Sequence, residues 1–482
     1  MERHRIKVGK TEISVETAKD TLSIMRGLSG RPSLSPNDGM LFIFPRPKRY
    51  RFWMPDMHFP IDIIWINDDK VVDITESASN KFNPLHPKFY RPLCDANYVL
   101  EVNAGFSEEK GIKVGDVVDL DGASRRFVIQ NAGPESEREW NKFVRENHPP
   151  IGAFLGSWEW SDFQKSLGWE VNRYLVKEND KLAAVFAVAK YPTFFGLSHA
   201  YTHRGPVIAK EYVDDEIANF EILRTIQSWA RKNLTSVIFL RTEPSLSSIS
   251  PDIEKYGFHR PSYYIQPRYN TAVPLGRSEE EIFAGFHSST RSNLRRSGKR
   301  GATVEMKKEL TDKDLKQFFS MVESTLKRNH GKNAYPDFNY LKIFFSGLPV
   351  LDPDKKYDPT KLSIGVFWGY QNGEPAAAHF VVFFGDTATY LFGASYADKL
   401  GSKIETSLHW AAMQEAKKLG MHYYDLGGVD ERVWPTLTDF KRQFNGEEFQ
   451  YVGNIDIPIH AGSYYLYNFL KKAKKKVRNH HW

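Results

Sequence analysis

The residues most suggestive of chemistry lie near the C-terminus. Residues 437–459 read LTDFKRQFNGEEFQYVGNIDIPI and place Lys441 beside Phe440 and Phe444. A fixed cation in a dry, aromatic-walled site stabilises the oxyanion that forms when an amine attacks an acyl carbon. Two interpretations follow. Lys441 is either the cation of an acyl-transfer site or a surface lysine next to two core aromatic residues.

A second group of candidate residues is basic. STRSNLRRSGKRGATVEM, residues 289–306, places Arg291, Arg295 and Lys299 at steps of four, which align on one face of a helix. Such a stripe neutralises several phosphates and predicts salt-sensitive binding of RNA or of a nucleotide-linked ligand. The alternative is a solvated basic face.

Two segments with the same order of elements surround these residues. The spacing of apolar residues predicts helices over residues 216–233 and 404–420. In the first segment every third residue from 220 to 229 is apolar: Phe220, Leu223, Ile226 and Trp229. Each helix follows a predicted pair of strands and precedes another strand; the strand segments are residues 181–208, 236–241, 374–395 and 422–428. A β-β-α-β order given twice predicts a duplicated acyltransferase-like domain.

The first 122 residues have a different sequence pattern from the rest of the chain. Short apolar runs such as GMLFIF and IDIIWI alternate with Pro, Asp and Gly turns and predict a small β-rich barrel or sandwich. A polar stretch with Gly and Pro places the boundary near residues 122–128. The overall fold class expected is α+β.

Composition limits the compartment and the chemistry. The chain has 482 residues, enough for two or three domains, and a single cysteine, Cys94, which excludes an intramolecular disulfide. We expect no metal site, since no Cys, His and carboxylate cluster has ligand spacing. No signal peptide or run of about 18 apolar residues is visible, so we expect a cytoplasmic protein.

The net charge of +7 is concentrated at the C-terminus. The last 12 residues, KKAKKKVRNHHW, carry six Lys or Arg and no acidic residue. This basic tail attracts anionic lipid headgroups or RNA, which predicts peripheral contact with the inner face of a membrane. A solvated, frayed terminus is the alternative.

The N-terminal region resembles a known family. GLSGRPSLSPNDGMLFIFPRPKRYRFWMPDMHFPIDIIWIN and YVLEVNAGFSEEKGIKVGDVV are similar to DUF192, a bacterial domain of unknown function. The resemblance implies a fold and no established chemistry. Its candidate functional residues are Arg26, Trp53, Met54 and Asp62, and the alternative is that they stabilise the barrel through packing and turns.

From about Trp140 onward the chain resembles the FemAB/FemX family, whose enzymes add amino acids from aminoacyl-tRNA to the peptide stem of peptidoglycan precursors. The stretches that carry this resemblance are FLGSWEWSDFQKSLGW, YTHRGPV, SEEEIFAGFHSSTRSNLRRSGKRG, ATYLFGASYADK, YYDLGGV and LTDFKRQFNGEEFQYVGNIDIPI. The resemblance implies two GNAT-like halves, over residues 123–267 and 268–460, followed by a basic helix or tail over 461–482.

Individual roles follow from this resemblance alone. Phe440 and Lys441 match the pair placed near the reacting ester, with the lysine on the developing oxyanion. Lys165 matches a position that contacts the precursor's phosphates, and Tyr390 lies on the strand lining the precursor cleft. The family's second phosphate-binding arginine has no clear counterpart; Arg328 and Lys332 are the candidates. Asp425 and Gly427 are expected to shape a strand end and its turn.

The resemblance also implies the partners: an aminoacyl-tRNA and a peptidoglycan precursor, either lipid II or a UDP-MurNAc-peptide. It requires no cofactor. Acetyl-CoA is a poor candidate donor, because residues 394–410 contain one glycine, Gly401, where a pyrophosphate loop needs several. Two alternatives stay open: a same-fold N-acyltransferase using an acyl-CoA-type donor, and a non-catalytic module that binds RNA or precursor.

Overall fold

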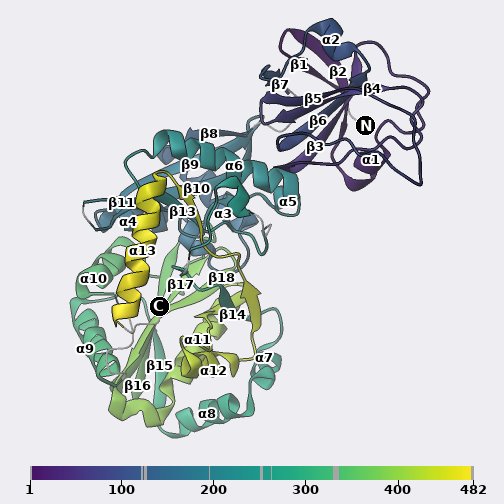
Figure 1. The fold of residues 1–482 in the computed structure, drawn as a ribbon. Helices are drawn as coiled ribbons and strands as arrows, with labels where there is room; N and C mark the ends of the chain where they lie inside the picture. Colours follow the sequence, from purple (N-terminus) through teal and green to yellow (C-terminus); the bar gives the residue numbers. More distant parts are fainter. Residues whose placement is uncertain are drawn as a thin grey trace. The chain divides into compact units, whose positions relative to one another are not determined.

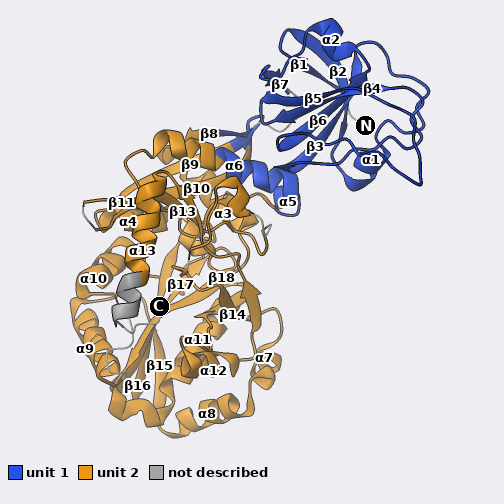
Figure 2. Ribbon diagram, in the orientation of Figure 1, with its two compact units in different colours: residues 1–128, 177–181, 211–225 blue, residues 129–176, 182–210, 226–482 orange. Residues whose placement is uncertain are grey.

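The structure is a computed structural model that describes residues 3–120, 123, 127–194, 196–249, 253–261, 263–328 and 336–478, the last six of these by their backbone only. Figure 2 shows its two compact units. Unit 1 comprises residues 1–128, 177–181 and 211–225, and unit 2 comprises 129–176, 182–210 and 226–482.

Unit 1 is built on one curled seven-stranded sheet in the order β5-β4-β6-β3-β2-β1-β7. The strands are β1 (Arg3–Val8), β2 (Thr11–Ala18), β3 (Asp38–Lys48), β4 (Ile61–Asn67), β5 (Lys70–Ala78), β6 (Ala96–Asn103) and β7 (Val118–Asp119). The sheet curls until β5 meets the turn before β7, where the amide of Val71 donates to the carbonyl of Asp116 at 3.0 Å. The predicted β-rich, barrel-like region is confirmed.

Apolar residues fill both faces of this sheet. One face packs against α2 (Phe106–Lys110) and the start of α6 (Glu216–Asn233), whose Ile217 joins that core. The other face is covered by the loops around α1 (Thr21–Arg26), residues 46–60 and residues 79–95. Of the DUF192-type candidates, Met54 is buried and Asp62 accepts backbone N–H groups from Ser77, Gly105 and Ser107, so both stabilise the fold.

The first sheet of unit 2 has the order β21-β13-β11-β10-β9-β8, with β12 beside β10. Its strands are β8 (Phe127–Asn131), β9 (Glu170–Glu178), β10 (Lys181–Pro192), β11 (Ser198–Tyr201), β12 (Val207–Ile208), β13 (Phe239–Thr242) and β21 (Ile455–Pro458). The helices of this part of unit 2 are α3 (Glu137–Asn147), α4 (Trp158–Ser166) and the second part of α6, from Ile226; α5 (Lys210–Val213) and the first part of α6 lie almost entirely in unit 1.

The second sheet has the order β15-β16-β17-β18-β19-β14-β20. Figure 1 labels β14, β15, β16, β17 and β18 of this sheet. Its strands are β14 (Tyr269–Pro274), β15 (Ala302–Lys307), β16 (Ser363–Gln371), β17 (Glu374–Phe384), β18 (Thr387–Ser395), β19 (Tyr423–Gly428) and β20 (Glu447–Gln450). Its helices are α7 (Glu279–Gly285), α8 (Ser288–Lys299), α9 (Asp312–Arg328), α10 (Phe338–Gly347), α11 (Ile404–Lys418) and α12 (Pro435–Arg442). The repeated β-β-α-β order is confirmed by β10-β11-α6-β13, in which the short β12 and α5 precede α6, and by β17-β18-α11-β19.

The end of the chain returns to the first sheet. β21 pairs antiparallel with β13, and α13 (Ala461–Arg478) follows it. Arg241 on β13 and Asp456 on β21 form a fully buried ion pair, with the Nε of Arg241 donating to Oδ1 at 2.6 Å and its Nη2 to Oδ2 at 2.8 Å. Among the described helices, none combines the length and apolar character needed to cross a bilayer.

Candidate active site

Lys441 is buried on the inner face of α12. Its side chain is 6% exposed, and its ammonium donates to the carbonyl oxygen of Gly428 at 2.8 Å. The helix turns Lys441 inward together with Phe440, and Phe444 follows two residues after the helix ends; both phenylalanines pack against the core of the second half. An ammonium has three donors, and the described residues provide this single hydrogen-bond acceptor, so donors remain for a ligand.

Burial controls the charge on this lysine. Removal from water lowers the pKa of Lys441 from 10.5 to about 8, and the negative charge of Asp425 opposes the decrease. The side chain therefore stays mainly cationic at neutral pH. A desolvated cation acts more strongly on a nearby developing charge than an exposed one.

Asp425 is the third of the six residues of β19 and is fully buried. Its Oδ1 accepts the backbone N–H of Gly427 at 2.7 Å, and the amide of Asn270 lies 3.4 Å from both carboxylate oxygens. Burial raises the pKa of Asp425 to about 6, although the N–H of Gly427 and the charge of Lys441 favour the ionised form. The carboxylate thus fixes the turn formed by residues 425–428 at the end of β19, and it provides the counter-charge for Lys441.

Gly427 lets the backbone approach Lys441 closely. Its φ is +84°, and a Cβ placed there would lie 3.3 Å from the Nζ of Lys441 and 3.8 Å from the carbonyl oxygen of Tyr390. Because β18 and β19 are parallel neighbours, this turn also brings Tyr390 to the site. Two residues predicted from sequence, Lys441 and Tyr390, therefore converge on one turn.

Aromatic rings form the wall beside Lys441. The His409 ring lies 4.7 Å from that of Tyr390, 5.7 Å from that of Phe440 and 5.4 Å from that of Phe444. Its Nδ1 is hydrogen-bonded at 2.9 Å to the hydroxyl of Tyr424. The wall supplies a site of low polarity, which favours a strong electrostatic role for the ammonium.

The histidines here are neutral at physiological pH. Burial lowers the pKa of His379 to about 3, and burial with the nearby charge of Lys441 places the pKa of His409 well below its usual value. His199 and His203 have pKa values lowered by burial to about 4 and about 3. Neutral, desolvated rings suit a packing role.

The other predicted substrate-binding residues lie elsewhere. Lys165 is exposed at the end of α4, 3.5 Å from the carboxylate of Asp162. Arg328 ends α9 and donates to the hydroxyl of Ser395 on β18 at 3.3 Å. Lys332 lies outside the described residues. The structure records no direct contact between Lys165 or Arg328 and Lys441.

The predicted basic stripe forms part of α8. Arg295 and Lys299 are exposed, with the guanidinium of Arg295 over the ring of Phe283 at 5.5 Å. Arg291 is half-buried and donates to the carbonyls of Ala284, at 3.0 Å, and Phe286. These contacts order the connection between α7 and α8, so Arg295 and Lys299 are the members of the stripe that remain open to a phosphate.

Sequence reasoning assigned no role to Arg204, which lies in the YTHRGPV stretch. Arg204 is 3% exposed, stacks over the ring of Tyr451 at 4.0 Å and donates to the carbonyl of Pro267 at 2.7 Å. Its positive charge favours the ionised form of Asp425 and so opposes the rise in pKa that burial causes. Arg204 therefore links the first half to the charges around Lys441. A lone arginine in a turn gave no spacing signal by which to find it.

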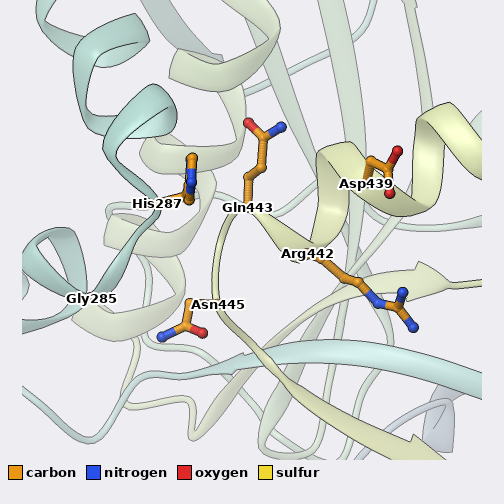
Figure 3. Close-up of a pocket in the computed structure, with 6 residues that line it drawn as sticks. All are labelled: Gly285, His287, Asp439, Arg442, Gln443 and Asn445. Atoms are coloured by element: carbon orange, nitrogen blue, oxygen red, sulfur yellow. The ribbon is translucent and has the colours of Figure 1, made fainter.

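A surface pocket of about 410 Å³ lies on the opposite face of α12 (Figure 3). It is lined by Gly285, His287, Asp439, Arg442, Gln443 and Asn445. Arg442 points away from His287 in Figure 3 and is paired with Glu431 and Glu448. Lys441 does not line this pocket, so the pocket and the buried ammonium are separate features of the same helix.

Comparisons with known proteins agree with this architecture. Residues 136–255 and 368–472 match the FemAB family, and residues 4–120 match DUF192, described as an uncharacterized ACR. Both resemblances noted in the sequence are confirmed.

Two staphylococcal relatives and one solved structure extend the comparison. Lipid II:glycine glycyltransferases from Staphylococcus epidermidis and Staphylococcus haemolyticus are each 23% identical over 71% of this chain and 97% of their own length. A crystal structure of FemX superposes with a TM-score of 0.57 at 18% identity, over 71% of this chain and all of FemX. The α+β fold with two GNAT-like halves is confirmed.

Proposed function

We propose that this chain, which joins a DUF192-like region to one matching the FemAB family, is an aminoacyltransferase of peptidoglycan bridge synthesis. It transfers an amino acid from aminoacyl-tRNA to the stem peptide of a peptidoglycan precursor. The observation that carries the proposal is the buried ammonium of Lys441, held by the carbonyl of Gly428 beside an aromatic wall. The glycyltransferase relatives support the acceptor class.

In the proposed reaction, the stem-peptide amine attacks the ester carbon of the aminoacyl-tRNA. A bond forms between nitrogen and carbon, and the carbonyl oxygen becomes an oxyanion that accepts a hydrogen bond from Lys441. The carbon–oxygen bond to the terminal ribose then breaks. The proton lost by the amine passes to the departing ribose oxygen with help from the neighbouring hydroxyl of the substrate, which fits a site whose histidines are neutral and buried.

The helix starts of both halves favour a donor other than acyl-CoA. A GNAT-type pyrophosphate needs unpaired N–H groups at a helix N-terminus. In α6, the N–H of Ala218 already donates to the carboxylate of Asp215 at 3.0 Å. In α11, the N–H groups of Ile404 and Thr406 donate to the Ser402 hydroxyl at 3.3 Å and the Lys403 carbonyl at 3.1 Å.

The acceptor is proposed to be lipid-linked, as the names of the relatives indicate for those enzymes. The basic tail, residues 471–482, supports peripheral contact with an anionic membrane surface. Deleting this tail should weaken vesicle binding of the full chain, and unchanged binding would remove this part of the proposal.

The reaction is tested by mixing the purified chain, charged tRNA and lipid-linked precursor, and then measuring the mass of the precursor. The expected result is a gain of one or more aminoacyl residues that is lost when the tRNA is digested beforehand. A parallel reaction replaces the charged tRNA with an acyl-CoA. Turnover with the CoA thioester and none with charged tRNA would overturn the proposed donor, and tight binding without either product would indicate a non-catalytic module.

A further inference from the structure

Exposed hydrophobic side chains gather on the loops of unit 1. Leu85 and Leu93 are 84% and 76% exposed, and Trp53 and Phe89 are close to half exposed. Leu22 and Met25 on α1, a helix with no buried residue, are also largely exposed. Such residues are unusual at a solvent-facing surface when they occur together.

The three segments that carry them form one layer. Phe52 and Tyr90 exchange backbone hydrogen bonds of 2.8 Å, and the Trp53 ring stacks on that of Phe89 with centroids 5.9 Å apart. After α1, the N–H of Gly30 donates to the carbonyl of Asp56 at 2.8 Å. Because the inner side chains of this layer fill the core on one face of the sheet, its outer side is a single surface.

The same loops are strongly basic. Residues 46–60 and 79–95 contain two acidic residues, Asp56 and Asp95, against seven Lys or Arg: Arg46, Lys48, Arg49, Arg51, Lys81, Lys88 and Arg91. Two of these arginines have carboxylate partners, Glu216 for Arg46 and, at 4.0 Å, Asp95 for Arg49. Lys48, Arg51, Lys81, Lys88 and Arg91 are exposed. The layer therefore presents apolar side chains among positive charges, and we call it the loop surface.

We propose that the loop surface binds an anionic lipid bilayer, which gives the DUF192-like region a membrane-docking role. Basic residues attract lipid headgroups, while Trp and exposed aliphatic side chains enter the boundary between headgroups and acyl chains. Leu85 suits such insertion, since it lies in a tight turn where its own N–H donates to the side chain of Asn83 at 2.9 Å.

Nucleic acid fits this surface less well. Trp53 and Phe89 are stacked on each other rather than separated to receive a base. Leu85 and Leu93 gain nothing from a hydrated phosphate backbone, whereas they gain apolar contacts in a bilayer. The inference does not rest on the proposed aminoacyl transfer.

The chain provides its own reporter for the test. Cys94 is its only cysteine, is exposed, and follows Leu93 directly. The full chain is labelled at Cys94 with an environment-sensitive dye and titrated with phosphatidylcholine vesicles, with and without about a third phosphatidylglycerol. The expected result is a blue-shifted, brighter emission with the anionic vesicles only. A chain lacking residues 471–482 should show the same change in emission, at a higher lipid concentration because the tail no longer adds to binding, which separates this surface from the tail.

Variants show which side chains are responsible, with unlabelled protein and vesicle sedimentation as the measurement. Leu85→Ser with Leu93→Ser should lower partitioning about tenfold or more. Lys48→Gln, Lys81→Gln and Lys88→Gln together should lower it on the order of a hundredfold, at roughly fivefold per charge. The matched control, Val114→Ser with Val117→Ser, removes two exposed apolar residues outside the loop surface and should change little.

Three results would overturn the assignment. The first is an unchanged dye spectrum while the chain still sediments with anionic vesicles. The second is equal partitioning of the leucine and control variants, with circular dichroism showing that both are folded. The third is a dye response to uncharged tRNA that vesicles do not produce, which would make the loop surface a nucleic-acid site. Each readout is independent of precursor turnover.

Discussion

Lys441 donates its ammonium to the carbonyl of Gly428 at 2.8 Å, across a turn whose N–H at Gly427 is held by Asp425 at 2.7 Å. A buried lysine and a buried carboxylate are thereby fixed through the backbone of one turn. Both carry free-energy penalties for burial, which a fold without a function at this turn could avoid by using apolar residues.

Replacing the ammonium should abolish turnover while sparing substrate binding. Lys441→Met keeps the length of the side chain and removes its charge, so we expect turnover to fall by about 10² to 10³. Binding of the precursor should change by no more than about twofold, because the interaction with the oxyanion exists only in the transition state. Mass spectrometry of the product and equilibrium binding measure the two effects.

Arg442→Met is the matched control for Lys441→Met. It removes a positive charge from the next residue of α12, where Arg442 is exposed and paired with Glu431 and Glu448. Turnover of this variant should stay close to that of the wild type. Equal losses in both variants would mean that α12 needs positive charge in general, and the role of Lys441 in the reaction would be withdrawn.

Activity should depend on pH through the same pair. The ammonium is lost as the pH rises through about 8, the pKa of Lys441, and the carboxylate is lost as it falls through about 6, the pKa of Asp425. A bell-shaped profile of turnover is expected between these values. Asp425→Asn removes a negative charge that raises the pKa of Lys441. The alkaline limb of the pH profile of this variant should therefore move to lower pH by about half a unit or more.

The control for that shift is Asp439→Asn, an exposed carboxylate on the same helix. Its profile should overlay that of the wild type. An alkaline limb that stays in place in Asp425→Asn would show that the limb reports another group, such as the attacking amine of the substrate.

Stability should reveal the burial of Lys441 independently of activity. The folded chain holds the Lys441 proton less tightly than the unfolded chain, where the pKa is near 10.5. Between pH 8 and 10.5 the unfolded state therefore binds more protons, and stability rises with pH. Lys441→Met lacks this gain, so the free energy of unfolding of the variant minus that of the wild type should decrease across this window by about 3 kcal/mol.

Urea unfolding at a series of pH values measures this difference. Lys418→Met, which removes a 62% exposed lysine from α11, provides the comparison and should give a difference that is flat with pH. A flat difference for Lys441→Met as well would mean that this lysine is hydrated in solution.

The turn glycine should affect catalysis beyond its effect on folding. Gly427→Ala places a methyl group 3.3 Å from the Nζ of Lys441 at a φ of +84°. Gly420→Ala has a similar φ of +78° with no atom within 4 Å, so it shares the backbone strain, about 1 kcal/mol, without the contact. Thermal unfolding should shift alike in both variants, while turnover should fall about tenfold or more in Gly427→Ala alone.

The sequence predicted the repeated elements because their signals are local. The spacing of Phe220, Leu223 and Ile226 predicts a helix, and the structure has α6 over Glu216–Asn233. Lys441 was predicted because Phe440 precedes it directly, Phe444 follows three residues later, and the Phe440–Lys441 pair matches the FemAB/FemX family. Its burial, its hydrogen bond to Gly428 and the charge of Asp425 depend on how β19 and α12 pack, which no local pattern encodes.

Contacts over long sequence separations were not predictable. Arg204 reaches Tyr451 and Pro267, and β21 returns to pair with β13 after the whole second half has been built. Neither has a spacing signal. For Trp53 the sequence left open a functional role or a role in packing the barrel; its ring lies half exposed and stacked on Phe89, because its loop packs Phe52 and Met54 inward instead.

The return of β21 gives a final prediction about stability. Asp456 is fully buried, accepts two hydrogen bonds from Arg241 and is also bonded by the hydroxyl of Tyr464 at 3.0 Å. Asp456→Asn leaves the guanidinium of Arg241 buried without a counter-charge, which costs about 3 to 5 kcal/mol. Asp456→Asn with Arg241→Met removes both charges and should recover much of that loss. Urea unfolding of the two variants measures this recovery. If the double variant is no more stable than Asp456→Asn, the charges of the pair do not hold β21 to β13.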